Sequence, residues 1–99
     1  MEYTIIQQGN TGGAFALDEG HKAGEMTFSV AGPQLKIIDH TEVDPEYKGR
    51  GLGLELLKTL IDSAREQGFK LMPLCPFAKA MFDKFPQYND VLFLERLLV

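Results

Sequence analysis

Hydrophobic and polar residues alternate along much of the first forty positions, which is the pattern of β-strands with one buried face. In the clearest stretch, Met26, Phe28 and Val30 alternate with polar residues. Turn residues interrupt the pattern at 12–13, 18–21 and 31–33. The sequence therefore predicts an antiparallel meander with strands at 3–8, at 14–17, around Met26 and at 34–43. A hairpin joins the second strand to the third.

The segment 34–43 has apolar residues on both of its faces. Simple alternation places Ile38, His40 and Glu42 on one face, and Thr41 and Val43 on the other. A strand that is apolar on both sides is typical of the centre of a sheet with cover on each face. We therefore expect a central strand here, which stops at the following proline.

The second half of the chain changes to a helical period. Segment 51–67 carries an apolar stripe with charged residues outside it, and Gly68 follows as the expected left-handed residue after the helix. Segment 69–74 is a predicted strand parallel to 34–43, because one helix connects the two. A second helix begins at Pro76 and ends at Pro86. The apolar tail 89–99 fits a strand, a short helix or an oligomer contact.

Length and composition limit the classes to which the chain can belong. Its 99 residues allow one domain, spanning 1–99. The formal net charge of −4 argues against nucleic acid as the main partner and favours a cationic substrate. A single cysteine excludes an internal disulfide, and no apolar run or signal segment indicates a membrane. We expect a cytoplasmic protein without membrane contact, either a monomer or a weak homodimer.

Three glycines separate the strand 34–43 from the helix 51–67, in Lys48-Gly49-Arg50-Gly51-Leu52-Gly53. Glycine lets backbone N–H groups approach an anion, and the first turn of a helix adds unpaired N–H groups and a positive dipole. The loop lacks the Walker A lysine after its glycines, and Leu56 stands where a Rossmann fingerprint needs its third glycine. We predict a site for the pyrophosphate of a cofactor; the alternative is a tight turn without a ligand.

This loop resembles motif A of the GNAT N-acetyltransferases, Gln/Arg-x-x-Gly-x-Gly/Ala, with Lys48 in the place of Gln or Arg. The segments His40-Thr41-Glu42-Val43 and Leu74-Cys75-Pro76-Phe77 narrow the resemblance to a subgroup of very small, single-domain members. The resemblance implies an α/β fold with a mixed sheet. An antiparallel N-terminal meander would precede a parallel pair formed by the fourth and fifth strands, with two helices, and that pair would splay apart.

The same resemblance implies acetyl-CoA as the cofactor. Its pantetheine would pair with backbone groups of Thr41 and Val43 in the manner of an added strand. Its pyrophosphate would bind the loop residues Lys48, Gly49, Arg50, Gly51, Leu52 and Gly53.

Three residues are candidates for the chemistry. Cys75 falls at the N-cap of the second helix, where the helix dipole favours a thiolate; its alternative is a small buried apolar residue. His40 is a possible proton acceptor for an ammonium nucleophile or a structural histidine, and Glu42 is a weaker base or positions the amine. Phe82 stands where many GNAT enzymes carry a tyrosine that protonates the departing thiolate. Cys75 would replace that acid, or would accept the acyl group first. His21, in a turn, has the pattern of a surface residue.

The expected function is transfer of an acetyl group from acetyl-CoA to an amine of a small molecule or a protein. One alternative is a non-catalytic coenzyme A sensor or carrier; turnover with a panel of amines would distinguish the enzyme from it. The other alternative is an interaction module that assembles through the apolar tail; a trace of cofactor bound to the purified protein would favour the enzyme or the sensor over this module.

Overall fold

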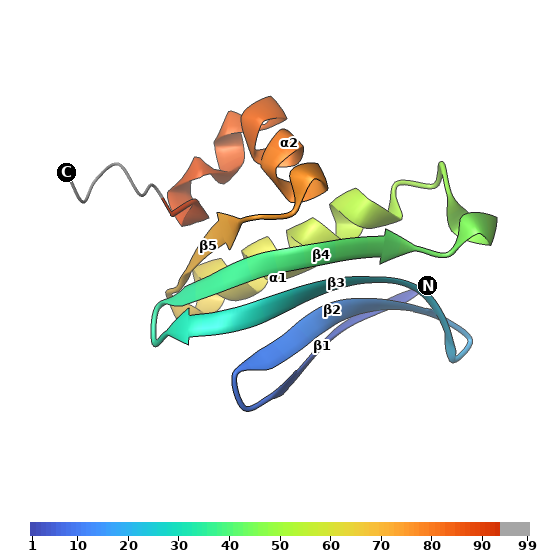
Figure 1. The fold of residues 1–99 in the computed structure, drawn as a ribbon. Coiled ribbons are helices and arrows are strands. Elements are labelled where there is room, and N and C mark those ends of the chain that lie inside the picture. Colours follow the sequence, from blue (N-terminus) through green and yellow to red (C-terminus); the bar gives the residue numbers. More distant parts are fainter. Residues whose placement is uncertain (94–99) are drawn as a thin grey trace.

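The chain forms one five-stranded sheet in a computed structural model that describes residues 1–93 (Figure 1). The strands are β1 (Glu2–Gln8), β2 (Thr11–Asp18), β3 (His21–Gly32), β4 (Leu35–Val43) and β5 (Lys70–Pro73), in that order across the sheet. The first four pair antiparallel, and β5 pairs parallel with β4. The predicted α/β class and strand order are confirmed. Residues 94–99 of the predicted tail lie outside the described part.

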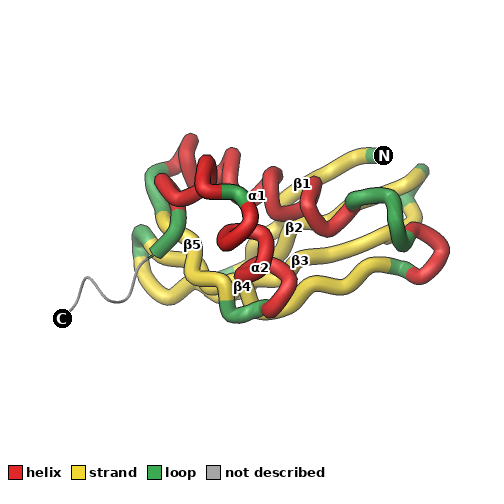
Figure 2. The backbone as a smooth tube through the Cα atoms, turned by 90° about the horizontal axis from the view of Figure 1, so that it is seen from above, coloured by secondary structure: helices red, strands yellow, loops and turns green. Residues whose placement is uncertain are grey.

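Two α-helices and two short 3-10 helices complete residues 1–93. They are η1 (Pro45–Tyr47), α1 (Leu52–Gln67), α2 (Pro76–Lys84) and η2 (Pro86–Val91). Helix α1 packs against β1 to β4, and α2 lies next to α1 and β5 (Figure 2). Within this part of the chain, no helix is long and apolar enough to cross a membrane.

Helix α1 buries the stripe predicted for it. Leu56, Leu57, Leu60 and Ile61 are fully buried, and they share the core with side chains of β3, β4 and β5. Gly68 ends the helix in the left-handed conformation, at φ 79°. The helix starts one residue later than predicted, because Gly51 is left-handed as well, at φ 77°, and forms the N-cap.

The sequence predicts a turn at residues 12–13, but Gly12 and Gly13 lie inside β2. A Cβ on Gly12 would press against Ile6 O and would lie 2.8 Å from the Phe28 ring. A Cβ on Gly13 would lie 3.1 Å from Met26 O. Close packing within the sheet therefore requires glycine at both positions. From the sequence alone, a glycine required by packing in a strand looks the same as a glycine required by a turn.

An irregularity in β4 changes which of its residues face the core. Thr27 pairs with His40, but the next residue, Phe28, pairs with Ile38, so Asp39 is an extra residue in β4. An extra residue shifts the alternation of side chains by one position. The prediction that Ile38 shares a face with His40 is therefore wrong.

The two faces of β4 differ beyond this bulge. Thr41 pairs with the fully buried Met26 and therefore faces the core. Asp39, His40 and Glu42 are exposed. The face of β4 opposite Thr41 is therefore open to solvent at these three positions. The prediction that both faces of the strand are covered by other elements is wrong there.

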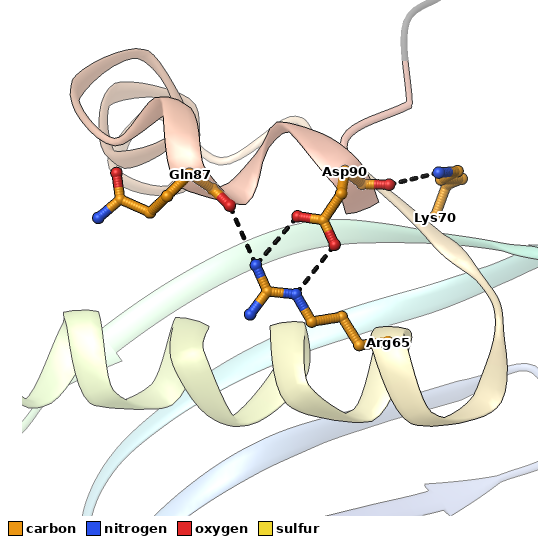
Figure 3. A network of polar contacts seen from close by, with 4 residues as sticks. All are labelled: Arg65, Lys70, Gln87 and Asp90. Atoms are coloured by element: carbon orange, nitrogen blue, oxygen red, sulfur yellow. Dashed lines mark hydrogen bonds and ion pairs between the residues drawn. The ribbon is translucent and has the colours of Figure 1, made fainter.

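A polar network fastens η2 to the rest of the fold (Figure 3). The Arg65 guanidinium donates to both carboxylate oxygens of Asp90, at 2.9 and 3.0 Å, and to Gln87 O at 3.0 Å. Lys70 Nζ donates to Asp90 O. The bonds connect α1 and β5 to η2, which buries Tyr88 and Val91.

Candidate functional site

The parallel pair β4–β5 is short and leaves a gap beside β4. Within β4, strand β5 pairs with Leu35 to Ile38 and with none of the later residues, and the chain then turns away, with the amides of Leu74 and Cys75 both donating to Ile38 O. From Asp39 onward, β4 has no partner strand on this side among residues 1–93. The unpaired edge offers backbone groups to an extended ligand.

The glycine loop (residues 48–53) follows β4 and η1 at the open end of this gap. Gly49 and Gly51 have positive φ, 81° and 77°, and no atom of residues 1–93 lies within 4 Å of the place where a Cβ would be at either. The loop leads into the first turn of α1, whose amides have no partner within the helix. Glycines with open space around them, next to a helix N-terminus, fit the phosphate groups of a ligand.

A cavity of about 380 Å³ joins the glycine loop to the end of β4. Its apolar wall comes from Leu54, Phe77 and Met81, on α1 and α2. The predicted cofactor residues that line it are Thr41, Val43, Lys48, Gly49, Gly51, Leu52 and Gly53. Arg50 is the predicted one that does not line it; its guanidinium carbon lies 4.9 Å from the centre of the Tyr47 ring.

Gly53 has a packing role in addition to its place in the loop. A Cβ on Gly53 would lie 2.7 Å from the ring of Phe77. This contact brings the first turn of α2 against the first turn of α1, and it holds the Phe77 ring at the cavity. A third glycine in the loop is thus required by helix packing whether or not a ligand is present.

Cys75 is the N-cap of α2 and is buried, with 5% of its surface exposed. Its Sγ lies 3.1 Å from Oγ1 of Thr41, which lines the cavity. Because Pro76 at the first helical position has no N–H, the free amides of this helix start are those of Phe77 and Ala78. Thiol, threonine and helix start therefore lie together at the closed end of the gap.

His40 and Glu42 lie apart from this group, on the open face of β4. Thr27 Oγ1 is 3.5 Å from His40 O, so His40 contacts β3 through its backbone. Glu42 lines a second cavity, of about 250 Å³, with Lys22, Glu25 and Asp44. The structure thus places Thr41 beside Cys75, and His40 and Glu42 on the other side of the strand.

Tyr47 lines the main cavity but does not belong to the residues predicted to bind a ligand. Its phenol donates to Asp18 Oδ2 at 2.6 Å, and this hydrogen bond, with burial, raises the pKa of Tyr47. Phe77 and Met81 also line the cavity, and both pack against the core as well. Their i, i+4 spacing was the available signal, since it puts both on one side of α2.

Phe82, at the position expected for a tyrosine acid, is 3% exposed and belongs to the core. Its ring has no proton to donate. Tyr88 carries a phenol, but this residue is buried in η2 beside Phe85 and Arg65.

Comparison with known proteins gives one family and several similar structures. The family model described as GCN5-related N-acetyl-transferase matches residues 14–91. A GCN5-like protein from Staphylococcus aureus, solved by NMR, is 36% identical with a TM-score of 0.68, and the match covers 93% of this chain and 90% of that one. No curated protein matches the sequence.

Two larger enzymes share the fold. The ribosomal-protein-S18-alanine N-acetyltransferase from Escherichia coli is 24% identical with a TM-score of 0.65, covering 79% of this chain and 53% of that one. The ribosomal-protein-alanine N-acetyltransferase from Brucella melitensis biovar Abortus 2308 is 21% identical with a TM-score of 0.63, covering 77% and 61%. The fold of this chain thus matches 53% and 61% of the length of these two proteins.

Proposed function

Because this chain belongs to the GCN5-related N-acetyltransferase family, we propose that it binds acetyl-CoA along the glycine loop and the free edge of β4 and transfers the acetyl group to an amine. The observation that carries the proposal is the cavity of about 380 Å³ that joins the loop to Thr41 and Val43. The binding unit would be the single domain predicted for 1–99.

The glycine loop would hold the pyrophosphate. Gly49 and Gly51 leave room for phosphate oxygens at the backbone, and the N-terminus of α1 contributes its dipole. Lys48 and Arg50 are exposed and add positive charge at the same place. Glycine backbone supplies most of this binding, which explains why a lysine serves where Gln or Arg is usual.

Backbone groups of Thr41 and Val43 would hold the pantetheine. The bulge at Asp39 changes the alternation of β4, so that both side chains face the core side while the strand edge beyond Ile38 stays unpaired. Phe77 and Met81 close the cavity with apolar surface, which favours an extended alkyl amide chain over water. The acyl end would then lie next to Cys75.

Cys75 would act on the thioester in one of two ways. As an acid, its thiol gives a proton to the departing coenzyme A thiolate after the amine nitrogen attacks the carbonyl carbon and the C–S bond breaks. As a nucleophile, its thiolate attacks the carbonyl carbon first, and the C–S bond to coenzyme A breaks with coenzyme A leaving as a thiolate, which takes a proton from water. The amine nitrogen then attacks the acetyl-cysteine thioester, the bond to Cys75 Sγ breaks, and the cysteine thiolate is restored. Thr41 Oγ1, 3.1 Å from the sulfur, orients it in either case.

His40 and Glu42 would serve the acceptor from the open face of β4. His40 would take the proton that the acceptor's ammonium group must lose before its nitrogen can attack, and Glu42 would position the positively charged acceptor before that step. The net charge of −4 favours such an acceptor. Both a small-molecule amine and a protein amine fit this arrangement.

A coenzyme A sensor without turnover is the second candidate, since Phe82 is buried where a proton donor would be expected and Cys75 is 5% exposed. Titration with acetyl-CoA, followed through backbone amide shifts, tests binding: the largest shifts should fall on Gly49, Gly51 and Thr41. Release of free coenzyme A with a panel of amines then tests transfer. Shifts without release would favour the sensor, and absence of shifts in the glycine loop would overturn both functions.

A further inference from the structure

We propose that Asp18 and His21, at the tip of the β2–β3 hairpin, are positioning residues that hold the glycine loop in the shape that binds phosphate. This inference rests on the proposed function, because the loop is taken as the pyrophosphate site. Neither residue lines the main cavity, and both would act through residues next to the loop.

The hairpin tip is a tight two-residue turn that brings the two side chains together. Asp18 and His21 face each other as the last pair of β2 and β3. The two residues between them, Glu19 and Gly20, both have positive φ, at 48° and 86°. A two-residue turn of this kind fits the twist of the strands it connects. Asp18 and His21 are therefore cross-strand neighbours on one face of the hairpin.

Asp18 holds the residue that precedes the loop. Its Oδ2 accepts the hydrogen bond from Tyr47 Oη at 2.6 Å. The Tyr47 ring lines the cavity, and the Arg50 guanidinium carbon lies 4.9 Å from its centre. Asp18 thereby holds the Tyr47 ring, which lines the cavity, and through this ring it also holds Arg50 of the glycine loop.

His21 holds the start of η1. Its Nε2 lies 3.0 Å from Asp44 Oδ2, while Asp44 Oδ1 accepts from Glu46 N at 3.0 Å as the N-cap of η1. The amide of Glu46 and the imidazole of His21 together lower the pKa of Asp44. The His21 ring also stacks on Tyr47, with 6.0 Å between ring centres and 25° between planes. Asp18 and His21 thus contact the two ends of η1, at Tyr47 and at the N-cap Asp44.

These contacts matter because the loop has little else to hold it. In the described part of the chain, Gly49 and Gly51 have no neighbouring atom within 4 Å of a Cβ position, so packing by these residues does not restrain the loop there. Glycine backbone also loses more entropy on ordering than any other. An anchor at Tyr47, one residue before the loop, lowers the cost of ordering it when phosphate binds.

Removal of the anchor should loosen the loop and weaken coenzyme A binding. In Asp18→Leu and in Tyr47→Phe, we expect the ¹⁵N order parameters of Gly49 and Gly51 in the free protein to fall. The Kd for coenzyme A should rise roughly three- to ten-fold, the range expected from the loss of one such hydrogen bond. His21→Leu should act in the same direction, and Asp18→Asn, which keeps an acceptor for the phenol, should stay within about two-fold of the parent.

Thr59→Val is the control for Tyr47→Phe. Thr59 Oγ1 donates to Glu55 O at 2.8 Å on α1, so this variant also removes a hydroxyl hydrogen bond but lies away from the loop and from β4. It should leave both loop order and coenzyme A affinity unchanged.

A shorter acetyl donor separates positioning of the loop from a general loss of stability. S-acetylpantetheine has no pyrophosphate, so it does not need the loop. Tyr47→Phe should therefore lower kcat/KM for acetyl-CoA and leave kcat/KM for S-acetylpantetheine unchanged.

The outcomes separate this inference from the function on which it rests. If the parent protein binds no coenzyme A, the proposed function fails, and the order parameters of the free loop still decide whether Asp18 and His21 restrain it. If the parent binds and Asp18→Leu keeps parental loop order and affinity, the positioning role is refuted. An equal loss with both acetyl donors would also refute it, because it would show a structural effect only.

Discussion

Thr41 Oγ1 and Cys75 Sγ lie 3.1 Å apart, although the two residues are 34 positions apart in the chain. Thr41 reaches this position because the bulge at Asp39 turns it toward the core, opposite Met26. Cys75 reaches it because the chain leaves β5 and starts α2 beside Ile38. The contact closes the gap between β4 and β5 at its inner end and connects the thiol to the main cavity.

Thr41→Val should slow reactions of Cys75 without loss of fold. The variant keeps the shape of the side chain, but the sulfur loses its hydroxyl partner, so alkylation by a small reagent should slow by about five-fold, the loss expected for one hydrogen bond. Thr59→Val is the control, because Thr59 Oγ1 donates to Glu55 O on α1, away from the site. An unchanged alkylation rate in Thr41→Val would mean that the hydroxyl does not orient the thiol.

Gly51→Leu should abolish coenzyme A binding, and Gly68→Leu should not. The two glycines bound the same helix, have φ of 77° and 79°, and have open space at the Cβ position. A left-handed non-glycine residue costs about 1–2 kcal/mol at either place, so both variants should lose a similar free energy of unfolding. Isothermal titration then compares their affinities. Equal affinities would show that a ligand does not approach the backbone at Gly51.

Gly53→Ala should destabilise the fold through the Phe77 ring, 2.7 Å from the new methyl group. Overpacking of this kind costs about 1–3 kcal/mol, partly offset by the better helix propensity of alanine. Phe77→Leu in the same chain removes the ring, and the double variant should therefore be more stable than the sum of the single changes predicts. Denaturant unfolding of the four proteins measures this coupling; additive effects would contradict the contact.

The sheet and its order could be predicted from the sequence because alternation, turns and one crossover each follow from local pattern. The helix α1 and its buried stripe are examples, since Leu56 to Ala64 repeat with the helical period. The bulge at Asp39 could not be predicted in this way. It depends on how Thr27 and Phe28 pair with β4, which is a relation between two strands and not a property of either sequence.

The candidate site could be predicted where a short sequence motif forms it, and not where segments far apart in the chain come together. The glycine loop and Cys75 were recognisable in the sequence, and the cavity brings the loop together with Thr41 and Val43. Tyr47, Phe77 and Met81 were missed as cavity residues, because aromatic and thioether side chains near helices are usually core. The link from Tyr47 to Asp18 spans 29 positions, and no local signal marks it.

Acid should weaken the attachment of η2 through Asp90. Arg65 lowers the pKa of Asp90, chiefly through their hydrogen bonds. A carboxylate with a lowered pKa stabilises the fold above its unfolded pKa of about 3.9, and this contribution disappears as the pH falls through the folded value. Asp90→Asn should therefore be less stable than the parent near neutral pH and should lose less stability below about pH 4.

Thermal unfolding across pH 2–7 measures the effect of Asp90→Asn. Asp83→Asn, an exposed change on α2 outside the ion pairs of residues 1–93, is its control and should follow the parent curve. The Arg65–Asp90 pair is exposed, so the expected difference near neutral pH is small. Parallel curves for Asp90→Asn and the parent would show that the pair adds nothing to stability.

Cys75→Ala should keep coenzyme A affinity and lose acyl transfer, because the loop binds and the thiol does the chemistry. The Kd should stay within about two-fold of the parent, and kcat should fall by about 100-fold or more, the usual loss with an acid or nucleophile. In the parent, bound coenzyme A should protect Cys75 from a small alkylating reagent, since the pantetheine would fill the gap in front of the sulfur. Mass spectrometry after mixing with acetyl-CoA distinguishes the two roles: one added acetyl group, absent in Cys75→Ala, indicates an acyl acceptor, and no adduct with intact turnover indicates a proton donor. Parental turnover in Cys75→Ala would make the thiol structural and would leave His40 as the residue to replace next.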